Sequence, residues 1–320
     1  MRNFLAKYGG IIIGSLYGLI MREFFGIQDN VEFVDLFSIT FIWIVPFVIG
    51  ISPIFFATKE QLASNRFCIS RPILAVLLFF MTAFWTGKED IICIVILSIP
   101  FLIAAGLAGY VFAKFIERRR NKNGALYSLF IVPLVAGFAE AKFPTPSQTY
   151  EVETVVIINA KPETIWENIV RVKEIGPKEY KKGFFNYAGI PRPLYAELDR
   201  DTIGATRIGH FEGGLTFKET VTTWERDKRV AFTITVIPSS IRRTVFDQHI
   251  LKGNHFIFLN ASYDLEQLGE RQTKLTLSST YQLDTKINGY SAFWGQRLLT
   301  DFQERLLAVI KSRCVIDKTH

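Results

Sequence analysis

The sequence is poor in cysteine and histidine and contains none of the short motifs that mark common enzyme classes. Its three cysteines, Cys68, Cys93 and Cys314, lie far apart and match no CxxC or zinc-binding spacing. A Walker loop, a GxSxG elbow, an HExxH helix and a dinucleotide-binding glycine fingerprint are all missing. We therefore expect unpaired structural cysteines, no metal and no cofactor.

Charge is also scarce, but only in the first half of the chain. Residues 1–148 carry 13 Lys+Arg and 9 Asp+Glu, whereas residues 149–320 carry 24 and 21. The net charge of +7 divides into +4 and +3, so neither half is basic enough to predict a nucleic-acid partner. The change in composition predicts two domains, a membrane domain over residues 1–142 and a soluble domain over residues 150–316.

The first half contains five apolar stretches, which predict an α-helical transmembrane bundle of about five spans. A helix needs about 20 apolar residues to span the thickness of the hydrocarbon layer, and its backbone groups must be hydrogen-bonded within the helix because no water is present there. The third and fifth stretches are short, and an interfacial or re-entrant segment is the alternative for each. No ionisable residue lies in the middle of a stretch, which disfavours an ion-coupled pump. The stretches are 8–27, 36–57, 72–87, 91–113 and 124–140.

Loop charges predict the orientation of these spans. The N-terminal tail and the loops at 58–71 and 114–123 are basic, whereas the loop with Asp29, Glu32 and Asp35 is acidic. Because positive loops stay on the cytoplasmic side, we expect the N-terminus inside a multi-pass protein of the inner (plasma) membrane. Five crossings would put the C-terminal domain in the periplasm or outside the cell, and one crossing fewer would put it in the cytoplasm.

Glycines repeat every fourth residue in the first stretch, at Gly10, Gly14 and Gly18. Small residues at this spacing let two helix backbones approach closely. The repeat predicts either packing within the chain, which we favour, or the seam of a homo-oligomer.

The second half reads as an α+β domain. Residues 141–150 contain two prolines and predict an extended linker. A Val/Ile-rich strand over 151–159 is followed by a helix with Pro162 in its first turn. Further strands are predicted at 204–212, 215–226, 229–237, 254–266 and 272–283, and a long amphipathic helix at 290–313.

The stretch "VVIINAKPETIWENI" resembles the opening of the START-like, or SRPBCC, superfamily. A strand there ends in an Ala-x-Pro-x-x-(Val/Ile)-Trp helix start, matched here by Ala160, Pro162, Ile165 and Trp166. "GATRIGHF", "TTWERDKRVAFTI" and the final helix also fit, so the resemblance covers residues 150–315. It implies a helix-grip fold, in which a curved antiparallel sheet surrounds a long C-terminal helix. The cavity between them typically holds a lipid, sterol or polyketide. The five spans are no part of the family pattern.

Polar and aromatic residues of this half are candidates for ligand binding. His210 and Glu212 alternate on one predicted strand and so share a face, and Asp247 and His249 have the same spacing. Nothing in the sequence brings these two pairs together, so we expect no metal site. Acid–base catalysis and a polar network closing the cavity remain alternatives. The candidates are His210, Glu212, Phe217, Glu219, Asp247, His249, Tyr281 and Trp294.

Two loops are candidates for contact with a membrane. The long segment 238–255 carries Arg242 and Arg243, which could meet lipid phosphates or lie solvated at the surface. The segment "GFFNYAGIPRPLY" is rich in aromatic residues, glycine and proline. It could cover the cavity, dip into a membrane or pack in the core.

The leading hypothesis is a membrane-anchored protein that binds or transfers a hydrophobic, lipid-like molecule. The first alternative is an enzyme of the cyclase or hydrolase kind that uses polar residues of the same cavity. The second is a protein-interaction module that the spans merely anchor. The expected partners are a membrane and a hydrophobic small molecule.

Overall fold

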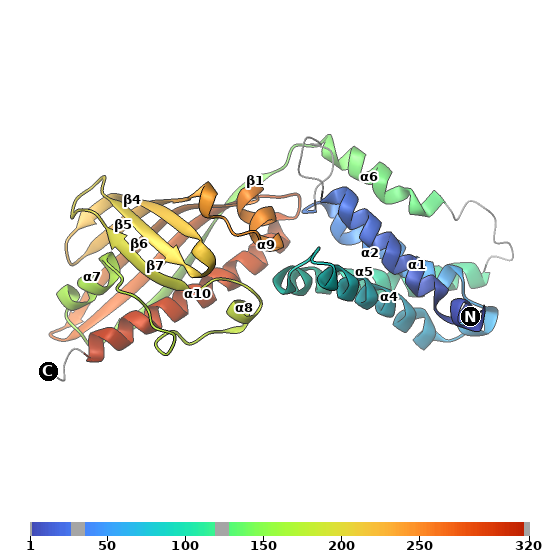
Figure 1. The fold of residues 1–320 in the computed structure, drawn as a ribbon, viewed down its shortest axis with the longest axis horizontal. Coiled ribbons are helices and arrows are strands. Elements are labelled where there is room, and N and C mark those ends of the chain that lie inside the picture. The colour runs from blue at the N-terminus through green and yellow to red at the C-terminus, as the bar shows by residue number, and fades with distance from the viewer. Residues whose placement is uncertain (1, 27–35, 119–127, 317–320) are drawn as a thin grey trace. The chain divides into compact units, whose positions relative to one another are not determined.

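A computed structural model describes residues 2–26, 36–118 and 128–316 (Figure 1). The chain divides into two compact units. The first comprises Met1–Pro146 with Thr285–Ile287, and the second comprises Ser147–Asp284 with Asn288–His320. Each unit has hydrophobic core clusters built from its own side chains.

The described part of the first unit is helical. Ser64 begins its first long apolar helix, where the Ser64 hydroxyl accepts a hydrogen bond from the backbone N–H of Phe67. Thr58 and Gln61 form a capping box at the short helix before it. The elements are α1 (Arg2–Phe25), the π-helical turn η1 (Thr40–Ile44), α2 (Val45–Phe55), α3 (Lys59–Leu62), α4 (Asn65–Trp85), α5 (Ile91–Arg118) and α6 (Val132–Ala141).

Among the described residues, only α4 and α5 are long and apolar enough to cross a membrane. The prediction of about five spans is therefore wrong. The 36–57 stretch is helical and apolar only over Thr40–Phe55, and the last stretch only over Ser128–Ala141, and both are too short. Helix α1 has 24 residues but is not one of these two candidate spans.

The predicted orientation depended partly on charges that lie outside the described residues. These are Asp29, Glu32 and Asp35 in one loop and Arg119, Arg120 and Lys122 in another. The outward-facing C-terminal domain also depended on the five-span count, and it stays a prediction.

The glycine repeat of α1 packs within the chain. A Cβ atom on Gly10 would lie 2.7 Å from Cα of Pro53, and one on Gly14 would lie 2.9 Å from the carbonyl oxygen of Ile49. Helix α2 therefore approaches α1 as closely as the small residues allow. The spacing is accounted for without a second copy, and the homo-oligomer stays an untested prediction.

Helix α5 offers a matched test of this packing. A Cβ on Gly109 would lie 2.5 Å from the carbonyl oxygen of Cys68 and 2.2 Å from Cγ of Pro72, whereas one on Gly106 would meet only Ile69, at 4.0 Å. We expect Gly109→Ala to destabilise the first unit by about 1–3 kcal/mol, because backbone must move. Gly106→Ala should leave stability unchanged or raise it, since alanine favours the helix.

Thermal unfolding of the detergent-purified full chain measures both variants. Equal melting temperatures for Gly109→Ala and Gly106→Ala would contradict the close α4–α5 contact.

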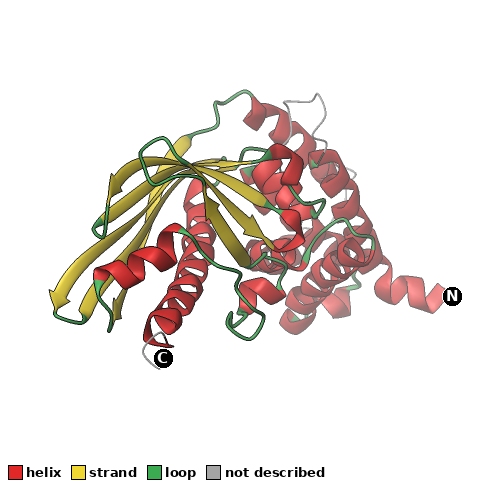
Figure 2. Ribbon diagram, turned by 60° about the vertical axis from the view of Figure 1, so that its left-hand side comes forward, coloured by secondary structure: helices red, strands yellow, loops and turns green. Residues whose placement is uncertain are grey.

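The second unit is one seven-stranded antiparallel sheet in the order β1-β7-β6-β5-β4-β3-β2. The sheet curls into a half-barrel, and the long helix α10 lies along its concave side (Figures 1 and 2). This is the helix-grip architecture expected from the sequence. Its elements are β1 (Ser147–Ile158), α7 (Pro162–Val170), α8 (Phe184–Tyr187), β2 (Pro193–Leu198), β3 (Thr206–Phe211), β4 (Thr216–Glu225), β5 (Arg229–Val236), α9 (Val245–Asp247), η5 (Gln248–Lys252), β6 (Phe256–Gly269), β7 (Gln272–Asp284) and α10 (Asn288–Ile316).

All six predicted strands and the terminal helix are present, with ends shifted by a few residues. Edge strand β2 was missed, because prolines at 191 and 193 indicate a loop. Pro193 is the first residue of this edge strand, a position where a missing N–H costs little. The opening helix α7 buries Ile165, Trp166 and Ile169 in the main core cluster.

Candidate functional site

The second unit contains a cavity of about 190 Å³ with mainly apolar walls. Its walls come from strands β2 to β7, from α10 and from the segment around α9 and η5. An engineered cavity of roughly 150 Å³ lined by Leu, Ile and Phe holds benzene. The hollow is therefore large enough for a small apolar molecule or part of a longer one.

Aromatic side chains keep the concave face of the sheet away from α10. Phe217 on β4 meets Phe258 on β6 edge to face, with ring centroids 5.1 Å apart. Phe211 at the end of β3 lies 5.9 Å, centroid to centroid, from Phe302 on α10. Leu298 and Leu306 of α10 also line the cavity. Edge-to-face rings brace a wall with few flexible groups.

A buried arginine lies in this apolar wall. Arg207 on β3 is 5 % exposed and faces Glu219, its cross-strand partner on β4, with which it forms an ion pair. Arg207 Nε donates to the carbonyl of Val170 at 3.1 Å and Nη2 to that of Ile169 at 3.2 Å. The guanidinium thus caps the C-terminus of α7, where carbonyls lack helical partners.

The charged state of Arg207 follows from opposing effects on its pKa. Burial disfavours the charged form of Arg207, but the carboxylate of Glu219 outweighs it and raises the arginine pKa. Burial also raises the pKa of Tyr263, another wall residue, to about 12. At neutral pH the wall therefore presents a charged guanidinium and a neutral phenol.

His210, on β3, also lines the cavity. Its ring stacks on Tyr195 of β2, with centroids 4.3 Å apart and planes 18° apart. Its Nε2 lies 4.0 Å from a carboxylate oxygen of Glu197, whose side chain is mostly exposed. The ring is held mainly by stacking and is not part of a tight acid–base pair.

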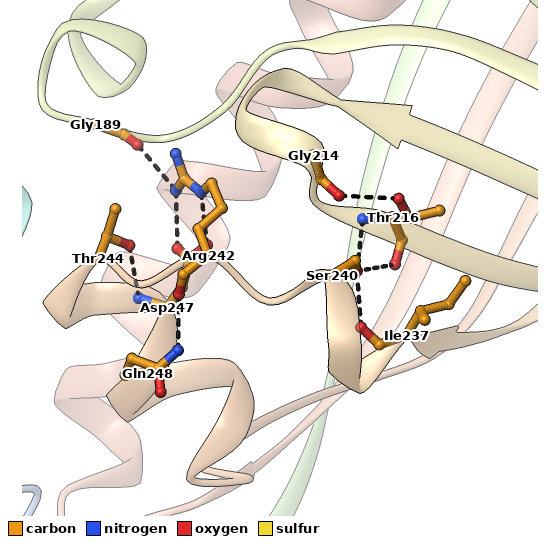
Figure 3. A network of polar contacts seen from close by, with 9 residues as sticks. All are labelled: Gly189, Gly214, Thr216, Ile237, Ser240, Arg242, Thr244, Asp247 and Gln248. Carbon is orange, nitrogen blue, oxygen red and sulfur yellow. Dashed lines mark hydrogen bonds and ion pairs between the residues drawn. The ribbon is translucent and has the colours of Figure 1, made fainter.

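Asp247 closes another part of the wall and is 2 % exposed. Arg242 binds it through two hydrogen bonds, Nε to Oδ2 at 2.7 Å and Nη2 to Oδ1 at 2.9 Å (Figure 3). The same Nη2 donates to the carbonyl of Gly189 at 3.1 Å, and the Arg242 carbonyl accepts from Gln248. Arg242 thus fastens the α9–η5 segment to the loop before β2, rather than being a solvated surface arginine.

Four of the predicted ligand-binding residues, His210, Phe217, Glu219 and Asp247, line the cavity. Glu212 does not, because β3 ends at Phe211, and its carboxylate pairs with Arg192 at 2.7 Å. His249 lies on the helical turn η5, where a spacing of two turns it away from Asp247. The shared strand face expected for His210 and Glu212 is therefore not formed, and the two-residue spacing of Asp247 and His249 does not bring these side chains together.

Tyr281 and Trp294 lie outside the cavity wall. Tyr281 shares a strand face with the wall residues Leu277 and Ser279, but it is fully buried in a second cluster with Val152 and Leu299. Its hydroxyl has no hydrogen-bond partner among the described residues. It lies against Gly295, where a Cβ would be 3.0 Å away.

Sequence reasoning missed Arg207 and Tyr263. A signal was available for Arg207, because the Gly213-Gly214 turn sets the β3–β4 register that puts it opposite Glu219. No group of three or more His, Cys, Asp or Glu side chains in the described ranges could hold a metal ion.

Comparison with protein-family models found no match, and comparison with curated proteins found none either. Among solved structures, the chain is similar to a protein from Nitrosospira multiformis, at 12% identity and a TM-score of 0.35 over 53% of this chain and 100% of that one. It is also similar to the Aha1 dimer from Colwellia psychrerythraea, at 17% identity and 0.31 over 53% and 98%. Truncated norcoclaurine synthase from Thalictrum flavum matches at 10% identity and 0.35 over 56% and 99%. The helix-grip description rests on the strand order and α10, not on these likenesses.

The buried pair predicts a pattern of stabilities. Glu219→Leu should destabilise the second unit by about 3–5 kcal/mol, because Arg207 is left buried without a countercharge. The double variant Arg207→Met/Glu219→Leu should cost less than Glu219→Leu alone. Arg171→Ala removes an exposed pair with Asp201 and should cost no more than about 1 kcal/mol.

Urea unfolding of the full chain in detergent, followed by tryptophan fluorescence, measures these differences. A Glu219→Leu variant as stable as Arg171→Ala would show that Arg207 is not held as a buried charge.

Proposed function

We propose that this protein binds a small hydrophobic, lipid-like molecule in the cavity between the sheet and α10, and that α4 and α5 anchor it in a membrane. The observation that carries the proposal is the apolar hollow of about 190 Å³ inside the second unit. Ligand sites of this kind are mostly apolar and largely preformed, with a few fixed polar groups.

The polar groups of the wall support binding over catalysis. A general acid or base must exchange a proton with the bound molecule. Of the lining carboxylates, Glu219 forms an ion pair with Arg207, and Asp247 accepts hydrogen bonds from Nε and Nη2 of Arg242. Such groups can orient the polar end of a ligand. No observation favours the cyclase or hydrolase alternative.

The hollow also distinguishes the proposal from the interaction-module alternative. A module that only docks another protein needs no internal space, and protein interiors are normally close-packed. The walls here converge from six strands and a helix on a space that the side chains leave open.

Filling the cavity should abolish ligand retention. Ala261 on β6 lines the cavity, whereas its neighbour Asn260 is exposed. Ala261→Phe places a ring where the ligand would lie, and Asn260→Phe adds the same ring outside. Mass spectrometry of an organic extract should find at least about a tenfold loss of co-purifying lipid for Ala261→Phe and no change for Asn260→Phe.

The protein for this experiment is taken from the membrane fraction after an alkaline wash. If the wild-type chain carries no lipid-like molecule, or if Ala261→Phe carries as much as wild type, the binding proposal fails. If the protein is washed off the membranes, the anchoring proposal fails.

A further inference from the structure

The loop before β2 exposes aromatic side chains. Phe184 and Tyr187 begin and end the short helix α8 and are 57% and 75% exposed. Single exposed apolar residues are ordinary on protein surfaces. Two large rings on one helical turn beside lysines are the composition that sits at a membrane–water interface.

The turn that exposes these rings is held in place. The Gly183 N–H donates to Asn186 Oδ1 at 3.0 Å, and Asn186 Nδ2 donates to the Ile190 carbonyl at 3.1 Å. Arg305 of α10 donates to the carbonyl of Lys181 at 2.7 Å. A structured turn therefore presents the rings to solvent against the hydrophobic effect.

Positive charge surrounds the same turn. Residues 173–192 contain five basic and two acidic side chains. Glu179 is paired with Arg313, and Glu212, just outside this range, pairs with both Lys182 and Arg192. Lys178 and Lys181 are exposed and form no ion pair within the described residues. Residues 178–187, here called the aromatic–lysine segment, therefore combine cationic and apolar groups that match an anionic lipid surface.

The segment leads directly into the cavity wall. Ile190 and Pro191, a few residues beyond Tyr187, line the cavity. The carbonyl of Gly189 accepts a hydrogen bond from Arg242, and the same arginine binds Asp247 of the α9–η5 segment (Figure 3). A surface that binds the aromatic–lysine segment is thus bound by residues that directly precede part of the cavity wall in the sequence.

We propose that the aromatic–lysine segment docks on an anionic lipid bilayer, with Phe184 and Tyr187 inserted among the headgroups, and so brings the cavity to the membrane surface. The role of this docking in loading the cavity rests on the proposed function. The docking itself is inferred only from the residues of the aromatic–lysine segment.

Spin labelling of the full chain in nanodiscs tests the docking. Cys68 and Cys314 are buried, so Cys93→Ala is the only background change needed. A nitroxide is attached to Tyr187→Cys and, as a matched control, to Ile203→Cys, whose side chain is 63% exposed in the β2–β3 loop. Collision rates with oxygen and with a water-soluble nickel chelate report the depth of each label.

In nanodiscs with phosphatidylglycerol, the label at 187 should be shielded from nickel and open to oxygen, and the label at 203 should stay in water. Replacing Lys178 and Lys181 with glutamine should reduce the docked-to-undocked ratio about fivefold for each lysine. Ala261→Phe should lose its lipid cargo but keep the docking, which separates the two proposals.

A label at 187 that is as open to nickel as that at 203 in every lipid would overturn the docking. So would a label at 187 that is shielded from both nickel and oxygen, which would indicate contact with a protein surface. Shielding that is equal in purely neutral lipid would contradict the role of the lysines.

Discussion

A charged guanidinium can stay inside the second unit only if it is fully paired, and much of the domain is arranged around that requirement. Arg207 forms an ion pair with Glu219 across the β3–β4 hairpin and also donates hydrogen bonds to the last two carbonyls of α7. The guanidinium carbon Cζ of Arg207 also lies 5.2 Å from the centroid of the Phe232 ring, which adds a cation–π interaction. One side chain thereby ties the opening helix to the middle of the sheet and gives an apolar cavity one fixed polar point.

Arg242 has a comparable role on the wall formed by α9 and η5. It joins Asp247, five residues away, to Gly189, 53 residues away, and its stem fills the space left by Gly213. Gly213 adopts a positive φ of 76°, which suits glycine, and a Cβ there would lie 2.6 Å from Cδ of Arg242. This part of the cavity wall is thus held together by three segments that are separate in the sequence.

The strands and the terminal helix of the second unit were predicted well because strand alternation and the apolar stripe of α10 are local patterns, and their helix-grip arrangement was implied by the family resemblance. Spans were overcounted because hydropathy marks apolar residues without showing where a helix begins, as at Thr40 in the 36–57 stretch. Four of the eight candidate residues line the cavity. The other four lie elsewhere for geometric reasons, such as the end of β3 before Glu212. The pairing of Arg207 with Glu219 could be predicted only from the strand register. The burial of Tyr281 outside the cavity wall could be predicted only from the position of α10.

The central claim is that the hollow over α10 holds a molecule the protein acquires in its own membrane. An electron-density map of the full chain, purified from those membranes without added ligand, tests it directly. The account predicts continuous non-protein density in contact with Phe217, Phe302 and Leu306. A cavity that is filled by the protein's own side chains, or that contains only ordered water, would contradict it.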